Sequence, residues 1–246
     1  MYLGLDEQDF EKYIYRTIPL KRLFQLFDEN QNTLVKPSMW EDTFENFVLK
    51  AKLMNEKGEI VEYNIHKRMY GQCWTQEKSS DAMWRIYSQD KRAIRIRAKI
   101  GDLLDSICIA TIDQANCGHC IGKVDYLRET ELVTRARKTF SETGKITFGG
   151  LFSSLLIKRR AFKHENEVRL MFCDWSDGAG TEDVFKYKIN PHELISQMML
   201  DPRLDKYQAE KLKSEIRTRT GFKGSIKRSL LYRLPESLII DVKTRI

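Results

Sequence analysis

Alternation of apolar and polar residues is clearest over residues 93–99, Ala-Ile-Arg-Ile-Arg-Ala-Lys. The two isoleucines fall on one side of an extended chain and the basic residues on the other, so this segment predicts a half-buried antiparallel strand. Shorter apolar runs between turn residues predict further strands at 14–17, 33–36, 69–76, 120–127, 165–173, 183–189, 197–200 and 225–230.

Apolar residues at helical spacing predict helices between these strands. Pro19 suits the first turn of a helix over 19–28. Asp42 can cap a second helix, with Glu45 completing a capping box and a buried face formed by Phe44, Phe47, Val48 and Ala51. Further helices are expected after Ser80 and at 130–141, 150–160 and 204–219. Strands and helices mix without βαβ regularity, which predicts one α+β domain over 1–246, with a mixed, mostly antiparallel sheet flanked by helices.

Composition favours a folded protein. The chain has 246 residues, of which 41% are hydrophobic and 11% aromatic, enough to bury a full core. No apolar run approaches the roughly 20 residues of a membrane span. The start of the chain lacks the basic and apolar regions of a signal peptide. We therefore expect a cytoplasmic protein without a membrane partner.

Five cysteines, an odd number, favour reduced thiols. Cys117 and Cys120 have the spacing of a zinc ligand pair, but the sequence offers no second pair. Because a closed zinc site needs four ligands, we expect an ordinary turn here and no metal.

The formal net charge is +7, from 42 Lys and Arg against 35 Asp and Glu, which favours anionic partners. Basic residues cluster at Lys158–Arg160, at the end of a predicted helix, and between Arg217 and Arg228. Such clusters suit either a solvated surface or nucleic-acid contact. No base-reading motif is present, so any nucleic-acid binding should be salt-sensitive and independent of base sequence.

Two segments carry candidate chemistry: residues 14–18, Ile-Tyr-Arg-Thr-Ile, and residues 165–169, Glu-Asn-Glu-Val-Arg. Glu165 and Glu167 are two positions apart and share a strand face. An arginine and such a pair on separate strands can clamp a pyrophosphate and hydrogen-bond a ribose hydroxyl. We expect Arg16 and Glu167 to line one cleft, because each lies on the polar face of its strand. Side chains on opposite faces of the sheet would contradict this nucleotide clamp. Alternatively, Arg16 pairs with a surface carboxylate, and residues 165–169 present an exposed polar face.

The order of short motifs resembles a prokaryotic and phage family catalogued as a domain of unknown function. The matching segments, over about residues 10–230, are Tyr15-Arg16, Trp40–Phe44, Cys73–Thr75, Trp84–Tyr87, Lys163–Arg169 and Met199–Arg203. The chain departs from that pattern in three places: Glu41 and Thr43 replace an Asn and a Pro, the helix lacks its His, and Ala93 replaces a Gly.

The order of a Tyr-Arg strand, a hydroxyl-bearing strand and a Glu-x-Glu strand is similar to that of ADP-ribosyltransferases. This resemblance implies an ADP-ribosyltransferase-like fold with NAD as substrate. It implies that Arg16 anchors phosphates or ribose, that Thr75 is the middle-strand hydroxyl, that Glu167 is the catalytic carboxylate and that Glu165 positions the acceptor. The other expected cofactor-binding residues are Tyr15, Trp84, Tyr87 and Arg169, although Trp84 and Tyr87 equally suit a core.

The resemblance implies an NAD-consuming transferase or glycohydrolase of toxin or phage-defence type, acting on an unknown protein or nucleic-acid acceptor. Two other functions fit the sequence. One is a basic nucleic-acid-binding or nuclease-like module, and the other is a scaffold that senses a nucleotide.

Overall fold

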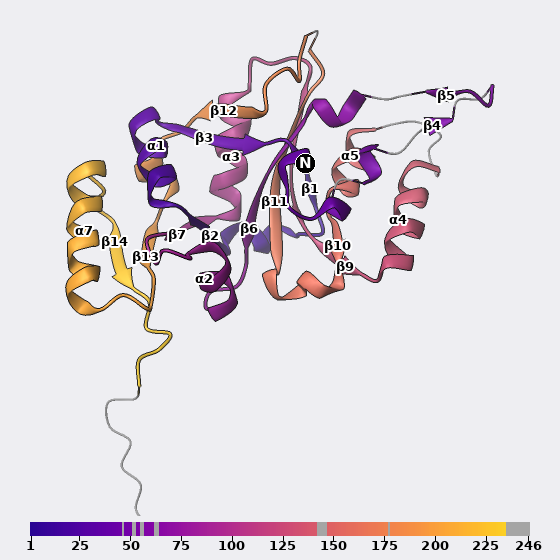
Figure 1. Ribbon diagram of the computed structural model, residues 1–246. Coiled ribbons are helices and arrows are strands. Elements are labelled where there is room, and N and C mark those ends of the chain that lie inside the picture. Colours follow the sequence, from indigo (N-terminus) through magenta and orange to yellow (C-terminus); the bar gives the residue numbers. More distant parts are fainter. Residues whose placement is uncertain are drawn as a thin grey trace, which may run out of the picture.

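A ten-stranded sheet runs through the molecule (Figure 1). The computed structural model describes residues 1–45, 47–50, 53–54, 57–61, 64–141, 147–176 and 178–234. The strands lie in the order β1 (Tyr2–Leu3), β8 (Cys117–Lys123), β11 (Glu167–Asp174), β6 (Met69–Thr75), β2 (Tyr13–Ile18), β7 (Ile94–Lys99), β13 (Gln197–Leu200) and β14 (Ser225–Arg228). Off this path, β3 (Gln31–Val35) pairs with β6 and with β12 (Val184–Lys188).

The sheet is mixed and mostly antiparallel, and the α+β prediction is confirmed. Only β1 with β8 and β13 with β14 pair in parallel among its described ladders. Two small sheets accompany it: β9 (Asp125–Leu127) with β10 (Ile157–Arg159), and β4 (Leu53–Met54) with β5 (Ile60–Val61).

The α-helices flank the main sheet. They are α1 (Leu20–Glu29), α2 (Asp81–Tyr87), α3 (Ile100–Ala110), α4 (Glu129–Ser141), α5 (Phe148–Ser154), α6 (Pro191–Leu194) and α7 (Lys206–Thr220). Short 3-10 helices are η1 (Glu7–Glu11), η2 (Pro37–Met39), η3 (Thr43–Glu45), η4 (Val48–Lys50), η5 (Asn64–Lys67) and η6 (Arg160–Glu165). No helix in these described ranges is both long and apolar enough to cross a bilayer.

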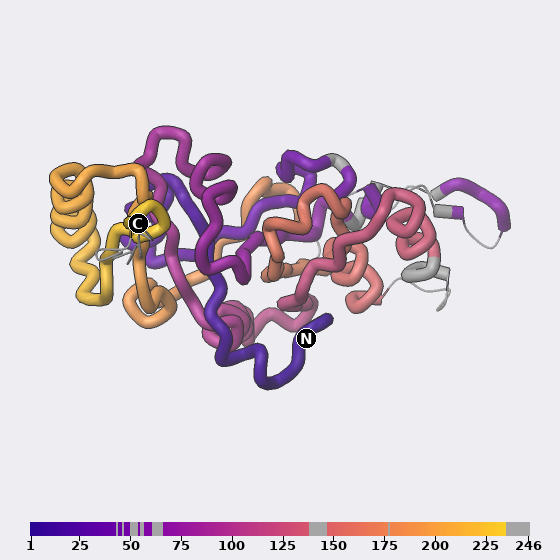
Figure 2. Tube along the Cα trace, turned by 90° about the horizontal axis from the view of Figure 1, so that it is seen from below, coloured from indigo at the N-terminus to yellow at the C-terminus, as the bar shows by residue number. Residues whose placement is uncertain are grey.

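The two faces of the sheet bury different cores. On one face, α3 packs against the apolar residues of β11 and β7, among them Leu170 and Ile96. On the other face, α5 covers the end of the sheet that contains Met171 and Cys120. Figure 2 shows α2 and α3 on opposite sides of the sheet, with α7 at one end of an elongated molecule and β4 and β5 at the other.

Some expected elements differ from those observed. Asp42 precedes only the short helix η3. The side chain of Glu45 contacts Lys158 and Arg169. Ala51 lies outside the described residues. The helix expected at 150–160 ends at Ser154, and the chain continues as β10 beside β9.

A helix after residue 99 was not expected from the sequence, and the strand expected from residue 120 begins at Cys117. The segment 100–110 forms α3, whose Ile100, Leu103 and Ile107 repeat at helical spacing and are buried. The turn expected at Cys117 is wrong, because these residues begin strand β8.

The pairing of β6 creates an opening in the sheet. One edge of β6 pairs with β2 only at Tyr15–Thr75 and with β3 only at Val35–Gly71. Beyond Tyr15, β2 continues along β7, and β3 continues along β12. The strands β2 and β3 therefore separate beside β6, and helix α1 connects them.

Candidate functional site

A cavity of about 560 Å³ lies at this opening. Its lining comes from β6, from the strands β2 and β3 that separate beside it, from helices α1 and α2, and from the start of β11. The lining residues include Tyr15, Arg16, Arg22, Gln25, Gln31, Thr33, Trp40, Gln72, Cys73, Thr75, Met83, Tyr87, Glu165, Glu167 and Lys186. Its volume falls within the roughly 300–1,000 Å³ of small-molecule sites.

Arg16 reaches this cavity as a partly buried cation without a carboxylate partner. Among the described residues, its side chain forms no hydrogen bond or ion pair. Burial lowers the pKa of the Arg16 guanidinium to about 10, so it stays charged near neutral pH. Because desolvation of an unpaired charge is costly, the cavity favours an anionic ligand at this position. The alternative of a surface ion pair for Arg16 is wrong.

Arg16 and Glu167 line the same cavity, as the sequence predicts. They do not share a face of the sheet. Residues paired across an antiparallel ladder lie on one face, and Tyr15 pairs with Thr75, which pairs with Glu167. Arg16 therefore leaves β2 on the opposite face. The expected clamp from a common polar face is contradicted, and the two residues meet the cavity only because it lies in the opening between strands.

The carboxylates at the other wall belong to a buried charge cluster, defined here as Glu45, Lys158, Glu165, Glu167 and Arg169. Lys158 Nζ lies 2.7 Å from Glu45 Oε1 and 2.6 Å from Glu167 Oε1, and it also contacts Glu165 Oε2. Arg169 Nη2 lies 3.0 Å from Glu45 Oε2 and 2.7 Å from Glu167 Oε2. The exposed polar face considered for residues 165–169 is therefore wrong, because the face is buried.

Aromatic rings cover both cations of this cluster. The guanidinium of Arg169 lies 4.5 Å from the ring centre of Trp40, and Lys158 Nζ lies 4.6 Å from that of Phe162. Such contacts stabilise desolvated cations. Trp40 also lines the cavity, so it separates Arg169 from the ligand space.

The two glutamates at the cavity have opposite pKa shifts. Burial raises the pKa of Glu165 to about 8, and its hydrogen bond and repulsion with Glu167 act in the same direction. Burial would also raise the pKa of Glu167, but Arg169, the hydrogen bond from Glu165 and Lys158 hold it well below its ordinary value. These surroundings therefore favour the protonated form of Glu165 and the ionised form of Glu167.

Three further expected residues line the cavity. The hydroxyl of Thr75 donates to the main-chain oxygen of Glu165 and accepts from the amide of Glu77 at 2.9 Å, so it fixes the backbone before β11. The hydroxyl of Tyr87 donates to Glu165 Oε1 at 3.4 Å. Tyr15 is buried beneath the guanidinium of Arg95, 4.8 Å from its ring centre.

Two expected cofactor-binding residues do not reach the cavity. Trp84 is 1% exposed and packs in the core, where Arg95 lies 5.7 Å from its ring centre. Arg169 is fully buried and binds Glu45, Glu167 and the main-chain oxygen of Leu155. Direct contact with a cofactor is contradicted for both.

Cys117 and Cys120 are three positions apart on β8, so they leave the strand on opposite faces. Cys120 is buried against α5, whereas Cys117 packs at the edge of the other core. The pair therefore does not converge on one ion. No cluster of three metal-ligating side chains occurs within the residues that the structure describes.

Sequence reasoning missed Lys158 and Glu45. Lys158 was expected on a helix-end surface, yet it lies on β10 and only 5% of it is exposed. No alternation marks this segment, because Leu156 and Ile157 are both apolar and suit a buried strand as well as a helix. A buried Glu-x-Glu segment requires a compensating cation, and Lys158 is close to it in sequence.

The comparisons with known proteins give a distant structural match. No family model and no curated protein match the chain, so the resemblance to the prokaryotic and phage family rests on its motifs alone. DarT of Thermus sp. 2.9 in complex with NAD+ matches at 7% identity and a TM-score of 0.37, over 89% of this chain and 96% of that one.

Two other complexes of DarT match at a similar level. The complex with carba-NAD+ has 8% identity and a TM-score of 0.36, over 92% of this chain and 97% of that one. The complex with ADP-ribosylated ssDNA has 8% identity and a TM-score of 0.39, over 93% and 98%. Identities and scores at this level are too low to transfer an activity or a residue's role.

The unpaired state of Arg16 generates a prediction on stability and anion binding. In Arg16→Met the apolar stem remains and the desolvated charge is lost, so the free energy of unfolding should stay level or rise by about 1 kcal/mol. Pyrophosphate should stabilise the wild type by about 2.7 kcal/mol at 100 times its Kd and leave Arg16→Met unchanged. Chemical denaturation with and without pyrophosphate measures both effects.

The matched control is Arg85→Met, which removes an exposed arginine of α2 outside the cavity. It should keep the response to pyrophosphate. Equal stabilisation of Arg16→Met and the wild type would exclude Arg16 as an anion site.

The raised pKa of Glu165 predicts a pH-dependent stability. Folding raises this pKa from 4.5 to about 8, so the folded protein keeps a proton that the unfolded chain releases between these values. This contribution is fully present below about pH 4.5 and is lost as the pH rises through about 8. Relative to Glu165→Gln, wild-type stability should fall over that window by roughly 1.4 kcal/mol per pH unit at most. Denaturation curves that run parallel for the two proteins would contradict a buried, protonated Glu165.

Proposed function

We propose that this protein is an NAD-consuming enzyme that cleaves NAD at the nicotinamide bond and passes ADP-ribose to water or to an acceptor. The observation that carries the proposal is one cavity lined by an unpaired arginine and by a carboxylate pair with divergent pKa shifts. The toxin or phage-defence role belongs to the same proposal and is supported by the resemblance of sequence motifs alone.

Arg16 provides the anion-binding end of the cavity. A pyrophosphate there would supply the negative charge that the described protein groups do not. Arg22 and Lys186 line the same space, but both already have partners, Gln25 at 2.7 Å and Glu29 at 2.8 Å. Arg16 and Glu167 line this opening from opposite faces of the sheet.

Glu167 provides the opposite end. Loss of nicotinamide develops an oxocarbenium-like charge on the ribose, which a nearby carboxylate stabilises. Lys158 and Arg169 each use one oxygen of Glu167, and a carboxylate retains further lone pairs for a ribose hydroxyl. These two cations keep Glu167 ionised and oriented at the cavity wall.

Glu165 suits a role with the incoming nucleophile. A carboxylate whose conjugate acid has a pKa of about 8 is a stronger base than an ordinary glutamate. Once ionised, it can accept the proton of water or of an acceptor hydroxyl as the new bond forms. Transfer to an acceptor should therefore increase as the pH rises through about 8, while Glu167 remains ionised throughout.

The two glutamates predict separable losses of activity. Glu167→Gln keeps the side chain's size but loses its charge, so nicotinamide release should fall by roughly 10²–10³-fold. The fold should persist, because Glu165 can release its proton and restore the negative charge beside Lys158. Glu165→Gln should be milder for nicotinamide release and harsher for transfer. Rates of nicotinamide release and of ADP-ribose incorporation, with circular dichroism of each variant, make the comparison. Full activity of a folded Glu167→Gln protein would remove the transferase proposal.

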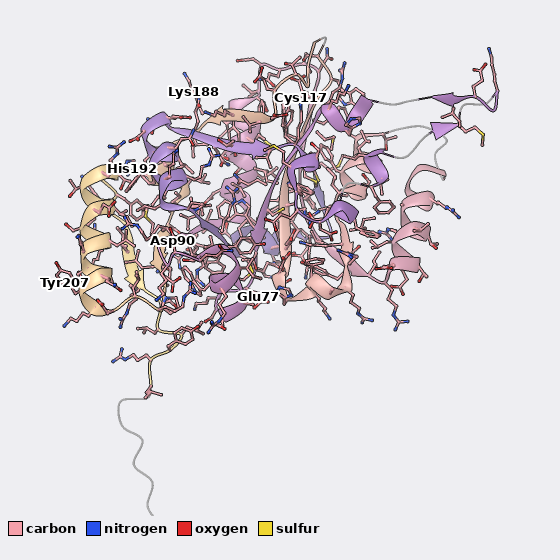
Figure 3. The ribbon with its side chains drawn as sticks, in the orientation of Figure 1. Glu77, Asp90, Cys117, Lys188, His192 and Tyr207 are labelled. Atoms are coloured by element: carbon pink, nitrogen blue, oxygen red, sulfur yellow. The ribbon has the colours of Figure 1, made fainter. Side chains whose placement is uncertain are left out.

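A second candidate function rests on the charge of the C-terminal segment. Residues 205–233 hold nine Lys and Arg against three Asp and Glu. This basic surface covers α7 and the edge strand β14, and it exposes Lys206, Lys211, Lys223 and Lys227. Figure 3 shows Tyr207 on the outer side of α7, where it is 77% exposed. Exposed lysines together with an exposed aromatic ring suit contact with nucleic acid, as an acceptor or as the ligand of a binding module.

Binding of nucleic acid to this surface should depend on salt and not on base sequence. Each phosphate contact contributes roughly 0.7–0.9 to the slope of log K against log salt concentration. Lys223→Ala with Lys227→Ala should therefore reduce that slope by about 1.4–1.8, whereas Lys123→Ala on β8 should leave it unchanged. Fluorescence anisotropy with labelled oligonucleotides of two unrelated sequences measures the slope. A constant affinity over the salt series would exclude this surface.

A further inference from the structure

Lys158 lies at the centre of the buried charge cluster. Its ammonium group forms ion pairs with three carboxylates, those of Glu45, Glu165 and Glu167, and donates hydrogen bonds to the last two. Its side chain is 6% exposed, and it does not line the cavity. Lys158 therefore acts on the cavity only through the glutamates that it holds.

The contacts of the three carboxylates differ in one respect. Among the described residues, Glu45 and Glu167 each form ion pairs with both Lys158 and Arg169, whereas the cation that Glu165 contacts is Lys158. Three carboxylates against two cations leave one negative charge in excess inside the protein. A buried cluster relieves such an excess by holding a proton, and the carboxylate with the fewest cation contacts is the one that keeps it.

We propose that Lys158 is the positioning residue of this site, which holds the carboxyl groups of Glu165 and Glu167 at the cavity wall and assigns the cluster's proton to Glu165. The proposal rests on the proposed function only for its catalytic consequence. The assignment of the proton is a property of the protein alone.

The groups around Glu165 agree with this assignment. Besides Lys158 of β10 and Glu167 of β11, Glu165 faces the hydroxyl of Tyr87 on α2 at 3.4 Å. Two further groups lie near Glu165. The hydroxyl of Tyr126 on β9 accepts a hydrogen bond from the backbone amide of Glu167 at 2.8 Å, and Glu45 of η3 contacts Lys158. Among these groups, Lys158 is the single cation in contact with Glu165, and it is the group that lowers a pKa which burial and Glu167 raise.

The proposal distinguishes three variants. Lys158→Met removes the cation, so the titration of Glu165 should move to higher pH. The cluster should then also take up a second proton, on Glu167. Lys158→Arg should restore much of the wild-type titration. Glu45→Gln keeps its size and removes a competitor for Lys158, so it should move the titration of Glu165 to lower pH.

A spectroscopic titration tests these expectations without a substrate. Infrared difference spectra report the carbonyl band of buried protonated carboxyl groups, and Glu165→Gln assigns the band. The wild type should lose this band as the pH rises through about 8. An unchanged midpoint in both Lys158→Met and Glu45→Gln would overturn the proposal.

A double variant keeps the test open if Lys158→Met does not fold. Lys158→Met with Glu45→Gln removes one cation and one carboxylate, so the net charge of the cluster stays the same. Positioning by Lys158 predicts a titration midpoint of Glu165 above that of the wild type, because Glu165 has lost its contact with Lys158. A midpoint equal to that of the wild type would show that only net charge matters and would overturn the proposal.

Kinetics then test the catalytic consequence. Lys158→Met should lower kcat for nicotinamide release on the order of 10²-fold and leave KM for NAD within a few-fold, because Lys158 does not touch the cavity. Lys158→Arg should recover part of kcat. A change confined to KM would overturn the positioning role. Absence of NAD cleavage in the wild type would remove the proposed function, while the infrared titration still decides the role of Lys158.

Discussion

The site depends on a competition between two strands for one edge of β6. A sheet edge can pair with one neighbour at each position, yet β2 pairs at Thr75 and β3 at Gly71. Between these points a side chain takes the place of a strand: Gln72 Nε2 donates to the main-chain oxygen of Thr33 at 2.9 Å. The opening is thus bounded by strands rather than by loops, and residues on such elements are held in place more firmly than residues on loops.

Burial of five charged side chains beside this opening is not explained by stability. A buried ion pair gains little over a well-packed apolar pair of the same volume. Here the cluster also leaves one carboxylate in excess. Strongly shifted pKa values and an uncompensated arginine are typical of functional sites, and both lie on one cavity. The energetic cost of the cluster therefore supports a chemical role for its glutamates.

The sequence predicts those parts of the fold that local pattern determines. The strands β2, β7 and β11 and the helices α1 and α7 follow from alternation, helical spacing and caps, and the motif residues Arg16, Thr75 and Glu167 do lie on one cavity. The roles expected for Trp84 and Arg169 failed, because whether a polar or aromatic side chain reaches a ligand depends on which elements cover it. Arg169 is covered by Trp40 and bound by Glu45, 124 positions away.

Lys158 was also misplaced by the sequence, in this case as a surface residue that proves to be buried. A lysine followed directly by two arginines has the composition of a surface. Its burial follows from the pairing of β10 with β9 and from three carboxylates on separate elements. The face of Arg16 was missed for a similar reason, since it depends on the register of β2 with β6. The alternation of apolar and polar residues within each strand does not determine the register between two strands about 60 positions apart.

The cavity has a cation, Arg16, and a carboxylate, Glu167, in its lining. At Arg16 a cation lacks a counter-charge, and at Glu167 a carboxylate is kept ionised by two cations that do not enter the cavity. A ligand that carries a permanent negative charge at one end and develops a positive charge at the other satisfies both walls. An inorganic anion alone satisfies only the first, and a cationic ligand alone only the second. This polarity, rather than the volume of the cavity, is the physical reason to prefer a dinucleotide whose glycosidic bond breaks beside Glu167.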